Sequence, residues 1–392
     1  MKSQKSIPFY KPIIQREDIL GVVETLRSGW ITAGPKTKEF EKKFADYVKA
    51  SEALALSSCT AGLHLALLCH GIGAGDIVIT TPITFCSGVR VIEMTGAVPL
   101  LVDVEPGTLN IDPRKIEKVI LQNKARKKKI KAILAVHFAG HVCDMKSIMR
   151  IARKYKLKVI EDAAHAIPAK YGEETVGGTK NMTAFSLYAT KNLTSGEGGM
   201  LTGPPALIQK ARRMSLHGMS RDAWKRYAVG GSWHYDVSVA GYKYNMTDIQ
   251  ASIGMSQLAK LNKLQKRRVE IVRAYNKSFS KIEALQIPSE ENYGTHAWHL
   301  YVLRLKPEKL KIDRDQFIRE LTALGIGTSV HFIPIHLHSY FKKKYKFKNS
   351  EFPVAFREYR RMFSLPLYPA MKQAEVARVI SAVLKIVREH KK

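Results

Sequence analysis

The sequence predicts an α/β protein in which a mostly parallel sheet is covered by helices and followed by a smaller α+β region. Short apolar runs that are typical of strands occur at residues 77–80, 99–104, 132–136 and 158–162. They alternate with stretches of helix length at residues 60–70, 113–122, 144–155 and 205–216. This alternation is typical of parallel sheets, whose crossover helices cover both faces.

A long helical pattern that begins near residue 247 is the second observation behind this fold class. With 392 residues, the chain exceeds the size of one ordinary domain core. The long helix is followed by a strand in AWHLYVLRL, a helix that starts near Asp313 and a final helix. We therefore expect a large α/β domain over residues 1–255, with an N-terminal packing and substrate segment at 1–35, and a small α+β domain over residues 256–392.

The composition is that of a soluble globular protein. Hydrophobic residues make up 45% of the chain and charged residues 25%, and no apolar stretch approaches the roughly 20 residues that cross a bilayer. The first residues, MKSQKSIPFYKP, lack the apolar segment of a signal peptide. We therefore expect a cytoplasmic protein without membrane insertion. The four cysteines show no CxxC spacing, which favours ordinary thiols.

The net charge of +30 suggests an anionic partner. Nucleic acid, an anionic membrane surface and small polyanionic substrates all fit such a charge. The basic residues are spread along the chain, with local runs at 124–131 and 341–348, and no nucleic-acid-binding motif accompanies them. We interpret both runs as solvated surface and expect no specific nucleic-acid partner. An anionic substrate remains compatible with the charge.

Lys191 lies in the run FSLYATKNLTSGEGG, residues 185–199. The pattern predicts a strand over Phe185–Tyr188 that breaks into a loop rich in Gly, Ser and Thr. An amine held in a desolvated pocket at such a loop can form a Schiff base with a carbonyl compound. The alternative is a solvated surface charge, because the chain carries 64 Lys and Arg residues.

A candidate anion site lies in LALSSCTAGLHLALLC, where a strand end is followed by Ser58, Cys59 and Thr60 and then by a helix. Free amides and the positive end of the helix dipole point out of such a helix start. Simple helix capping by Ser58 or Thr60 is the alternative. The glycines of GIGAGD follow the helix, so they indicate its end and not a dinucleotide site.

In VIEDAAHA, a strand ends at Glu161 and Asp162, and His165 follows closely. Ligands bind at the carboxyl ends of strands in open α/β sheets. A carboxylate at this place can hold a proton on a ring nitrogen, although helix capping by Asp162 is the alternative. An anion site, an acidic partner and Lys191 together match the needs of pyridoxal 5'-phosphate.

The motifs SGWITAGPKTKEFE, SSCTAGLHLAL, TPITF, GTLNIDP, VIEDAAHA, FSLYATKN, GEGG and GYKYNMTDIQA occur in this order. In order and spacing they resemble the sugar aminotransferases of the DegT/DnrJ/EryC1/StrS family. The resemblance covers the chain from about Pro8 to residue 369. It implies the type I fold of pyridoxal-phosphate-dependent transferases, known from aspartate aminotransferase. That fold has a mostly parallel seven-stranded sheet between layers of helices and a small C-terminal domain.

The resemblance also implies roles for single residues around the cofactor ring. Lys191 would be the catalytic Schiff-base lysine, and Asp162 would be the catalytic partner of the pyridine nitrogen. His165 would lie beside the ring and its hydroxyl group, where many members have Gln. Phe85 of TPITF would stack on the ring face.

For the cofactor phosphate, the resemblance implies contacts from Cys59, Thr60 and Ser186. Cys59 stands where relatives have a small residue, which is harmless if its backbone amide binds. GYKYNM departs from the GYNYRM form that is commoner in the family. In that form the Asn contacts the cofactor phosphate of the neighbouring subunit, and Lys243 takes its place here. Asn245 takes the place of the Arg in the same motif. A lysine can meet a phosphate as a point charge. The resemblance thus implies a homodimer with shared active sites.

The implied reaction moves an amino group from glutamate, or another amino donor, to a keto-sugar nucleotide. Members with His at the lysine position dehydrate sugars, so Lys191 argues for amination. Within the family, SGWITAGPK, EDAAHA, GYKYN, THAWHLY and IGTSVHF are most similar to the members that make UDP-4-amino-4-deoxy-L-arabinose from a 4-keto precursor. Other acceptors remain open, namely a 3-keto nucleotide sugar, a keto form of an octulosonate or a non-sugar ketone. A non-catalytic regulatory protein on the same fold is the alternative outside enzymes.

Trp30, Thr32 and His331 are the candidate substrate contacts. Packing of the N-terminal segment and a half-buried strand histidine are equally good explanations of these residues. His336 and His338 follow His331 closely, but no carboxylate or cysteine completes a metal site. We therefore expect no metal. The sequence specifies neither the sugar and its nucleotide nor the biosynthetic pathway.

Overall fold

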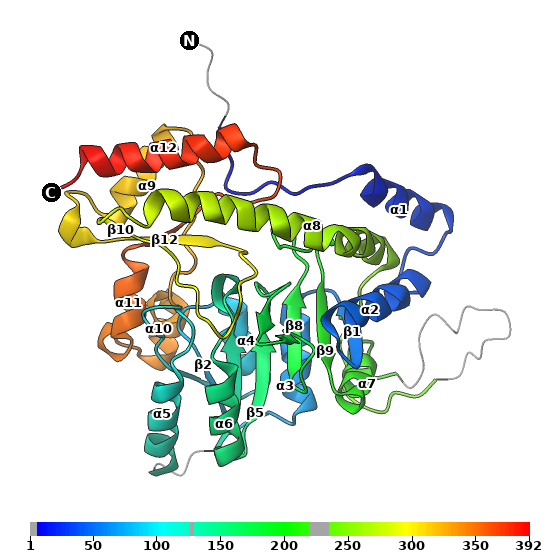
Figure 1. Cartoon of the computed structure of the whole chain (residues 1–392). Coiled ribbons are helices and arrows are strands. Elements are labelled where there is room, and N and C mark those ends of the chain that lie inside the picture. The colour runs from blue at the N-terminus through cyan, green and yellow to red at the C-terminus, as the bar shows by residue number, and fades with distance from the viewer. Residues whose placement is uncertain (1–5, 126–128, 220–234) are drawn as a thin grey trace.

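The computed structural model describes residues 6–125, 129–219 and 235–392. A seven-stranded sheet with the order β1-β9-β8-β5-β4-β2-β3 forms the centre of its larger part (Figure 1). Only β9 runs antiparallel to its neighbours, and the other pairs are parallel, which confirms the mostly parallel sheet. The strands are β1 (Glu52–Leu56), β2 (Asp76–Thr80), β3 (Val98–Leu101), β4 (Lys129–Val136), β5 (Lys158–Asp162), β8 (Met182–Ser186) and β9 (Gly199–Gly203).

Helices cover both faces of this sheet because successive strand residues point to opposite sides. In β4, Leu134 belongs to the hydrophobic core that contains residues of α3, α4 and α7, whereas Ile133 belongs to the core with residues of α5 and α6 on the other face. The first helices of the chain are α1 (Arg16–Arg27), α2 (Pro35–Val48), α3 (Cys59–Cys69), α4 (Cys86–Met94), α5 (Pro113–Ala125), α6 (Met145–Tyr155) and α7 (Pro205–Met214). The expected helical layers are therefore present.

The C-terminal part is built around the helix α8 (Asp248–Phe279) and a small antiparallel sheet. Figure 1 shows α12 and α9 stacked beyond α8, on the side away from the large sheet. The sheet contains β10 (Leu285–Gln286), β12 (Tyr301–Leu305) and β13 (Met362–Leu365), and the further helices are α9 (Arg314–Ala323), α10 (Ser339–Tyr345), α11 (Pro353–Tyr359) and α12 (Gln373–Glu389). Short strands also pair as β11 (Gly294–Thr295), β6 (Lys170–Tyr171) and β7 (Glu174–Thr175). Within the three described ranges, no helix combines the length and the apolar character that crossing a bilayer requires.

Helix α8 belongs to two hydrophobic cores at once. Its N-terminal half packs Ala251 and Leu261 against the core around Phe185, and its C-terminal half packs Val272 and Phe279 into the core of the C-terminal part. The expected boundary after residue 255 falls inside this continuous helix. The division into a large and a small domain therefore stays a prediction.

The N-terminal segment, residues 1–35, is fastened to α8 over the residues that the structure describes. The buried carboxylate of Asp248 accepts hydrogen bonds from the backbone amides of Gly34 and Thr37 at 2.8 and 2.9 Å, and from the Thr37 hydroxyl at 2.6 Å. These bonds hold the start of α2, where helical amides have no partner of their own. The segment also contains the helix α1, which the sequence patterns did not indicate.

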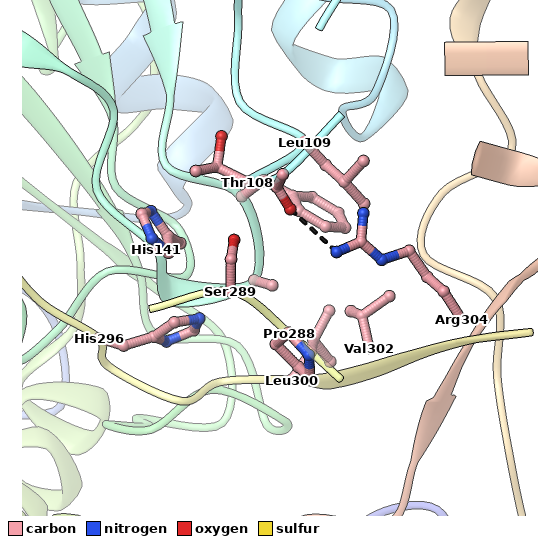
Figure 2. A pocket seen from close by; sticks show the side chains of 12 residues that line it. Thr108, Leu109, His141, Pro288, Ser289, His296, Leu300, Val302 and Arg304 are labelled. Atoms are coloured by element: carbon pink, nitrogen blue, oxygen red, sulfur yellow. Dashed lines mark hydrogen bonds between the residues drawn. The ribbon is translucent and has the colours of Figure 1, made fainter. Parts of the chain in front are cut away.

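The large sheet and the C-terminal part meet at a tightly packed junction (Figure 2). The side chain of Arg304 on β12 crosses this junction, and its Nη2 donates to the carbonyl of Gly107 at 3.0 Å. A cavity of only about 20 Å³ remains there, with Thr108, His141 and His296 among the residues that line it. That volume suits about one water molecule.

Candidate active site

A pocket of about 380 Å³ opens where two central strands end and one helix begins. Asp162 is the last residue of β5, Ser186 is the last residue of β8, and Cys59 is the first residue of α3. All three line the pocket. This position at the carboxyl ends of parallel strands is where ligands bind in open α/β sheets.

Lys191 reaches this pocket from a turn that follows β8. The strand expected over Phe185–Tyr188 ends at Ser186, because the carbonyl of the next residue, Leu187, accepts the amide of Ser195 in the loop at 2.9 Å. The amide of Lys191 donates to the Tyr188 carbonyl at 2.9 Å, which closes the turn. Burial lowers the pKa of Lys191 to about 8, and the nearby Cys59 and Asp162 oppose that shift. A lysine with this pKa is partly neutral, and therefore nucleophilic, near neutral pH.

Asp162 is buried and presents its carboxylate to the same pocket. Both hydrogen bonds to this carboxylate are made to Oδ1, from the Ala164 amide at 3.0 Å and from the Cys59 thiol at 3.9 Å. Oδ2 accepts none from the described residues. Burial raises the pKa of Asp162, and Lys191 opposes that shift. A cationic N–H donor beside Oδ2 would therefore offset the free-energy cost of burying this charged carboxylate.

Helix α3 begins at the wall of the pocket. The Ser58 hydroxyl accepts a hydrogen bond from the Ala61 amide at 3.1 Å, so Ser58 caps the helix. The amides of Cys59 and Thr60 lie in the first turn, where they have no acceptor within the helix. Gly199 of β9 packs directly on this turn, since a Cβ there would lie 2.3 Å from the carbonyl carbon of Ser58. The helix start is therefore held firmly by the sheet and can bind an anion.

Aromatic and histidine side chains form the remaining wall. His165 stacks on Phe332 with ring centroids 5.6 Å apart, and Phe332 lies 6.0 Å from Phe85. His331 also lines the pocket, and its Nδ1 lies 3.0 Å from the Ser364 hydroxyl. Burial lowers the pKa of His331 to about 4, with a further contribution from Lys191. Phe85 is 60% exposed and lies at the mouth of the pocket, where a flat ligand could cover it.

The sequence patterns did not single out two residues of this wall, His299 and Phe332. Both come from the C-terminal part of the chain and line the pocket beside Lys191. The run THAWHLY could have indicated His299, because it places this histidine shortly before the strand β12. Nothing in the local sequence shows that this end of β12 faces a strand end more than one hundred residues away.

Four of the proposed site residues do not line the pocket of their own chain. Lys243 is exposed, and the Asn245 side chain donates to the Met246 carbonyl at 3.3 Å. Trp30 is half-buried with its indole nitrogen 3.3 Å from the Ala33 carbonyl, and Thr32 is exposed. Their contacts with cofactor or substrate stay predictions.

His336 and His338, which follow His331 in the sequence, contact different residues. His336 is fully buried against Phe352, with ring centroids 4.9 Å apart, and His338 contacts the Ile333 carbonyl at 3.1 Å. Within the described part of the chain, no three His, Cys, Asp or Glu side chains gather as a metal site would require.

The side chains of the pocket fit pyridoxal 5'-phosphate. Lys191 supplies an amine with a lowered pKa, Asp162 supplies a desolvated carboxylate with one free oxygen, and the start of α3 supplies amides for a phosphate. Ser186 adds a hydroxyl near that helix start. A cofactor with an aldehyde, a basic ring nitrogen and a phosphate would meet a matching group at each point.

Comparison of the whole chain with known proteins also indicates an enzyme that uses pyridoxal phosphate. The model of the DegT/DnrJ/EryC1/StrS aminotransferase family matches residues 12–384. The chain is 48% identical to the uncharacterized protein MJ1066 of Methanocaldococcus jannaschii over 392 residues, which is the full length of both. It is also 47% identical over 389 residues to the spore coat polysaccharide biosynthesis protein SpsC of Bacillus subtilis, covering 99% of this chain and 98% of the relative.

Solved structures agree in fold. The putative sugar aminotransferase Spr1654 of Streptococcus pneumoniae superposes with a TM-score of 0.90 at 32% identity, covering 98% of this chain and 99% of that one. Its structures include forms with pyridoxal phosphate and with its amine counterpart, pyridoxamine phosphate. The chain therefore belongs to the DegT/DnrJ/EryC1/StrS aminotransferase family and is an aminotransferase that depends on pyridoxal 5'-phosphate.

Proposed function

We propose that this sugar aminotransferase transfers an amino group from glutamate, or a similar donor, to a keto-sugar nucleotide, with a 4-keto UDP-sugar as the acceptor. The observation that carries the proposal is Lys191 with its lowered pKa beside Asp162 in one desolvated pocket. The relatives named for sugar amination and spore coat polysaccharide synthesis support a sugar acceptor and a role in polysaccharide biosynthesis. A net charge of +30 suits an acceptor that carries a nucleotide diphosphate.

Each residue has a separate task in this proposal. Bound pyridoxal phosphate supplies an electrophilic aldehyde and a ring that withdraws electrons. Lys191 would be the amine that binds this aldehyde and that later carries the proton to and from the reacting carbon. With the cofactor bound, Asp162 would hold the proton on the ring nitrogen, and His165 would lie beside the ring.

The amides of Cys59 and Thr60 and the hydroxyl of Ser186 would hold the phosphate. Phe85 would stack on the ring of the cofactor. His331, Trp30 and Thr32 are the proposed sugar contacts. Of these, His331 lines the pocket, so its ring is the best supported of the three.

We further propose a cytoplasmic homodimer in which Lys243 of one subunit meets the cofactor phosphate of the other. Lys243 is exposed and does not line the pocket of its own chain, which supports a contact across the dimer. Mixed dimers test this directly. The Lys191→Ala and Lys243→Ala variants should each have low activity alone when the cofactor concentration is limiting. Mixing them should restore about a quarter of the wild-type activity. About half of the dimers are then mixed, and each mixed dimer has one complete site out of two. A mixture that is no better than its parts would exclude the shared site.

A panel of keto-sugar nucleotides tests the acceptor. The enzyme is first converted with glutamate to its amine-cofactor form, and each sugar is then scored by the return of the aldehyde cofactor absorption. We expect 4-keto UDP-sugars to give the fastest return. A faster return with a 3-keto nucleotide sugar or a keto-octulosonate would reassign the acceptor. A protein that takes up pyridoxal phosphate but reacts with no amino donor would favour the non-catalytic alternative.

A further inference from the structure

The residue after Lys191 is anchored from two sides. The Nδ2 atom of Asn192 donates to the carbonyl of Ile167 at 3.0 Å and to the carbonyl of Ala297 at 2.7 Å. These two acceptors use both hydrogens of the amide and so assign its orientation. The Oδ1 atom of Asn192 is then an acceptor, and it lies 3.3 Å from Nδ1 of His299. Asn192 and His299 are both buried.

This contact fixes the tautomer of His299. Nδ1 must carry the hydrogen that it donates to Asn192, so Nε2 keeps its lone pair. The pKa of His299 lies well below its ordinary value, mainly because of burial and with help from His165 and Lys191. The ring is therefore neutral and cannot turn over without breaking its bond to Asn192. His299 also lines the pocket of Lys191.

The neighbouring ring of His165 is fixed in the same manner. Its Nδ1 accepts a hydrogen bond from the Ala139 amide at 3.2 Å, which leaves the hydrogen on Nε2. The rings of His165 and His299 lie 4.3 Å apart. The backbone sets this spacing, because Leu300 donates its amide to the same Ala139 at 3.2 Å and Ala297 donates to Gly140 at 2.8 Å.

These contacts belong to the junction between the large sheet and the C-terminal part. Figure 2 shows another part of this junction, where His141, His296 and Leu300 line the small cavity. The cavity of about 20 Å³ is close to the size of one water molecule. The segment that carries His299 is thus packed on one side against this junction and on the other against the active-site pocket.

We propose that Asn192 and His299 act as a pair of positioning residues that hold Lys191 in its reactive place and tie it to the C-terminal part of the chain. The proposal rests on the proposed role of Lys191. A lysine that must both bind an aldehyde and carry a proton tolerates little displacement, since a misplacement of about 1 Å can cost about 100-fold in rate. Its own side chain is flexible, so a rigid backbone on its C-terminal side restricts where the amine can go.

The test compares three variants of the cofactor-loaded enzyme. His299→Phe keeps an aromatic ring beside His165 but removes the hydrogen that Asn192 accepts. His299→Asn keeps a donor near the place of Nδ1. His336→Phe is the matched control, because His336 is also a buried histidine in the C-terminal part, and neither of its nitrogens has a hydrogen-bond partner among the residues that the structure describes.

Three readouts separate positioning from simple stability. The first is the rate constant and the KM for the amino donor in the first half of the reaction, expressed per bound cofactor. The second is the fraction of cofactor that borohydride fixes onto Lys191, measured by mass spectrometry. The third is the midpoint of thermal unfolding. We expect His299→Phe to lower the rate constant about 10- to 100-fold and to reduce the fixed fraction, with the KM within about threefold.

His299→Asn should recover most of the rate, and His336→Phe should change only the unfolding midpoint. If His299→Phe changes the unfolding midpoint but not the rate per bound cofactor, the pair has a merely structural role. Should His299→Asn be as slow as His299→Phe, the hydrogen bond is not the cause. Asn192→Ser removes the acceptor of the same hydrogen bond. In the double variant Asn192→Ser/His299→Phe, the loss of rate should be smaller than the product of the two single losses. A wild-type protein that takes up no cofactor would instead contradict the proposed function.

Discussion

Replacing Lys191 with alanine is expected to lower the rate of amino transfer by at least about 10³-fold, because one amine both binds the cofactor and carries the proton. The variant should still bind pyridoxal phosphate through the start of α3 and the Asp162 carboxylate. Its absorption spectrum should resemble that of the free aldehyde. Borohydride treatment followed by mass spectrometry should find no cofactor attached to the protein. Stopped-flow absorbance with an amino donor measures the loss of rate.

Two further variants serve as controls for this result. Lys191→Arg keeps a positive charge at the pocket but cannot supply a neutral amine, so it should be as inactive as the alanine variant. Lys263→Ala removes an exposed lysine from α8 and should behave as the wild type. Substantial covalent attachment of the cofactor in Lys191→Ala would show that another lysine carries the chemistry.

A second test of Lys191 is the pH dependence of the rate at which the apoenzyme binds pyridoxal phosphate covalently, called the capture rate. The neutral amine attacks the aldehyde, so the capture rate should rise with pH until the amine has lost its proton. Burial lowers the pKa of Lys191 to about 8 from 10.5. The rate should therefore level off above about pH 8, and not above pH 10 as for an exposed lysine. Stopped-flow absorbance of the apoenzyme with pyridoxal phosphate measures the profile.

Replacing Asp162 with asparagine is expected to lower the rate of amino transfer by about 100-fold, which corresponds to about 3 kcal/mol for one charge-assisted hydrogen bond. The asparagine has the same shape but cannot hold a proton on a basic ring nitrogen. Its carbonyl can still accept the hydrogen bond of the Ala164 amide. The bound cofactor should accordingly show a ring nitrogen that is unprotonated at neutral pH, which nitrogen-15 NMR of labelled cofactor detects.

Glu161→Gln is the matched control on the same strand. Glu161 is as buried as Asp162, but its carboxylate is bonded to His137 at 2.9 Å and to Asn181 at 2.7 Å. Its loss should lower the free energy of unfolding without changing the protonation of the ring nitrogen. If Asp162→Asn leaves the ring nitrogen protonated, another group holds that proton.

Much of the fold follows from local patterns that the chain shows by itself. The strands β2, β4 and β5 contain short apolar runs at residues 77–79, 132–136 and 159–160 that are buried, as expected of strands covered on both faces, and the helices between them begin and end near their expected residues. The end of β1 was expected before Ser58, but β9 was not expected. β9 begins and ends with glycine, and it is the strand that runs antiparallel. Pairing partners far apart in the sequence decide such strands, so propensity cannot identify them.

The sequence by itself predicted Lys191, Asp162 and the helix start at Thr60 as one site, and all three line one pocket of the structure. Asp162 ends a strand, Thr60 lies in the first turn of a helix and Lys191 lies in the turn after a strand, and parallel strands bring such ends to one edge of the sheet. The tertiary structure alone decided which side chains complete the pocket. His299 and Phe332 arrive from the C-terminal part, and Asn192 is fixed by carbonyls that lie 25 and 105 residues away along the chain. Contacts at such separations leave no periodic pattern in the sequence, because packing forms them only once the whole chain has folded.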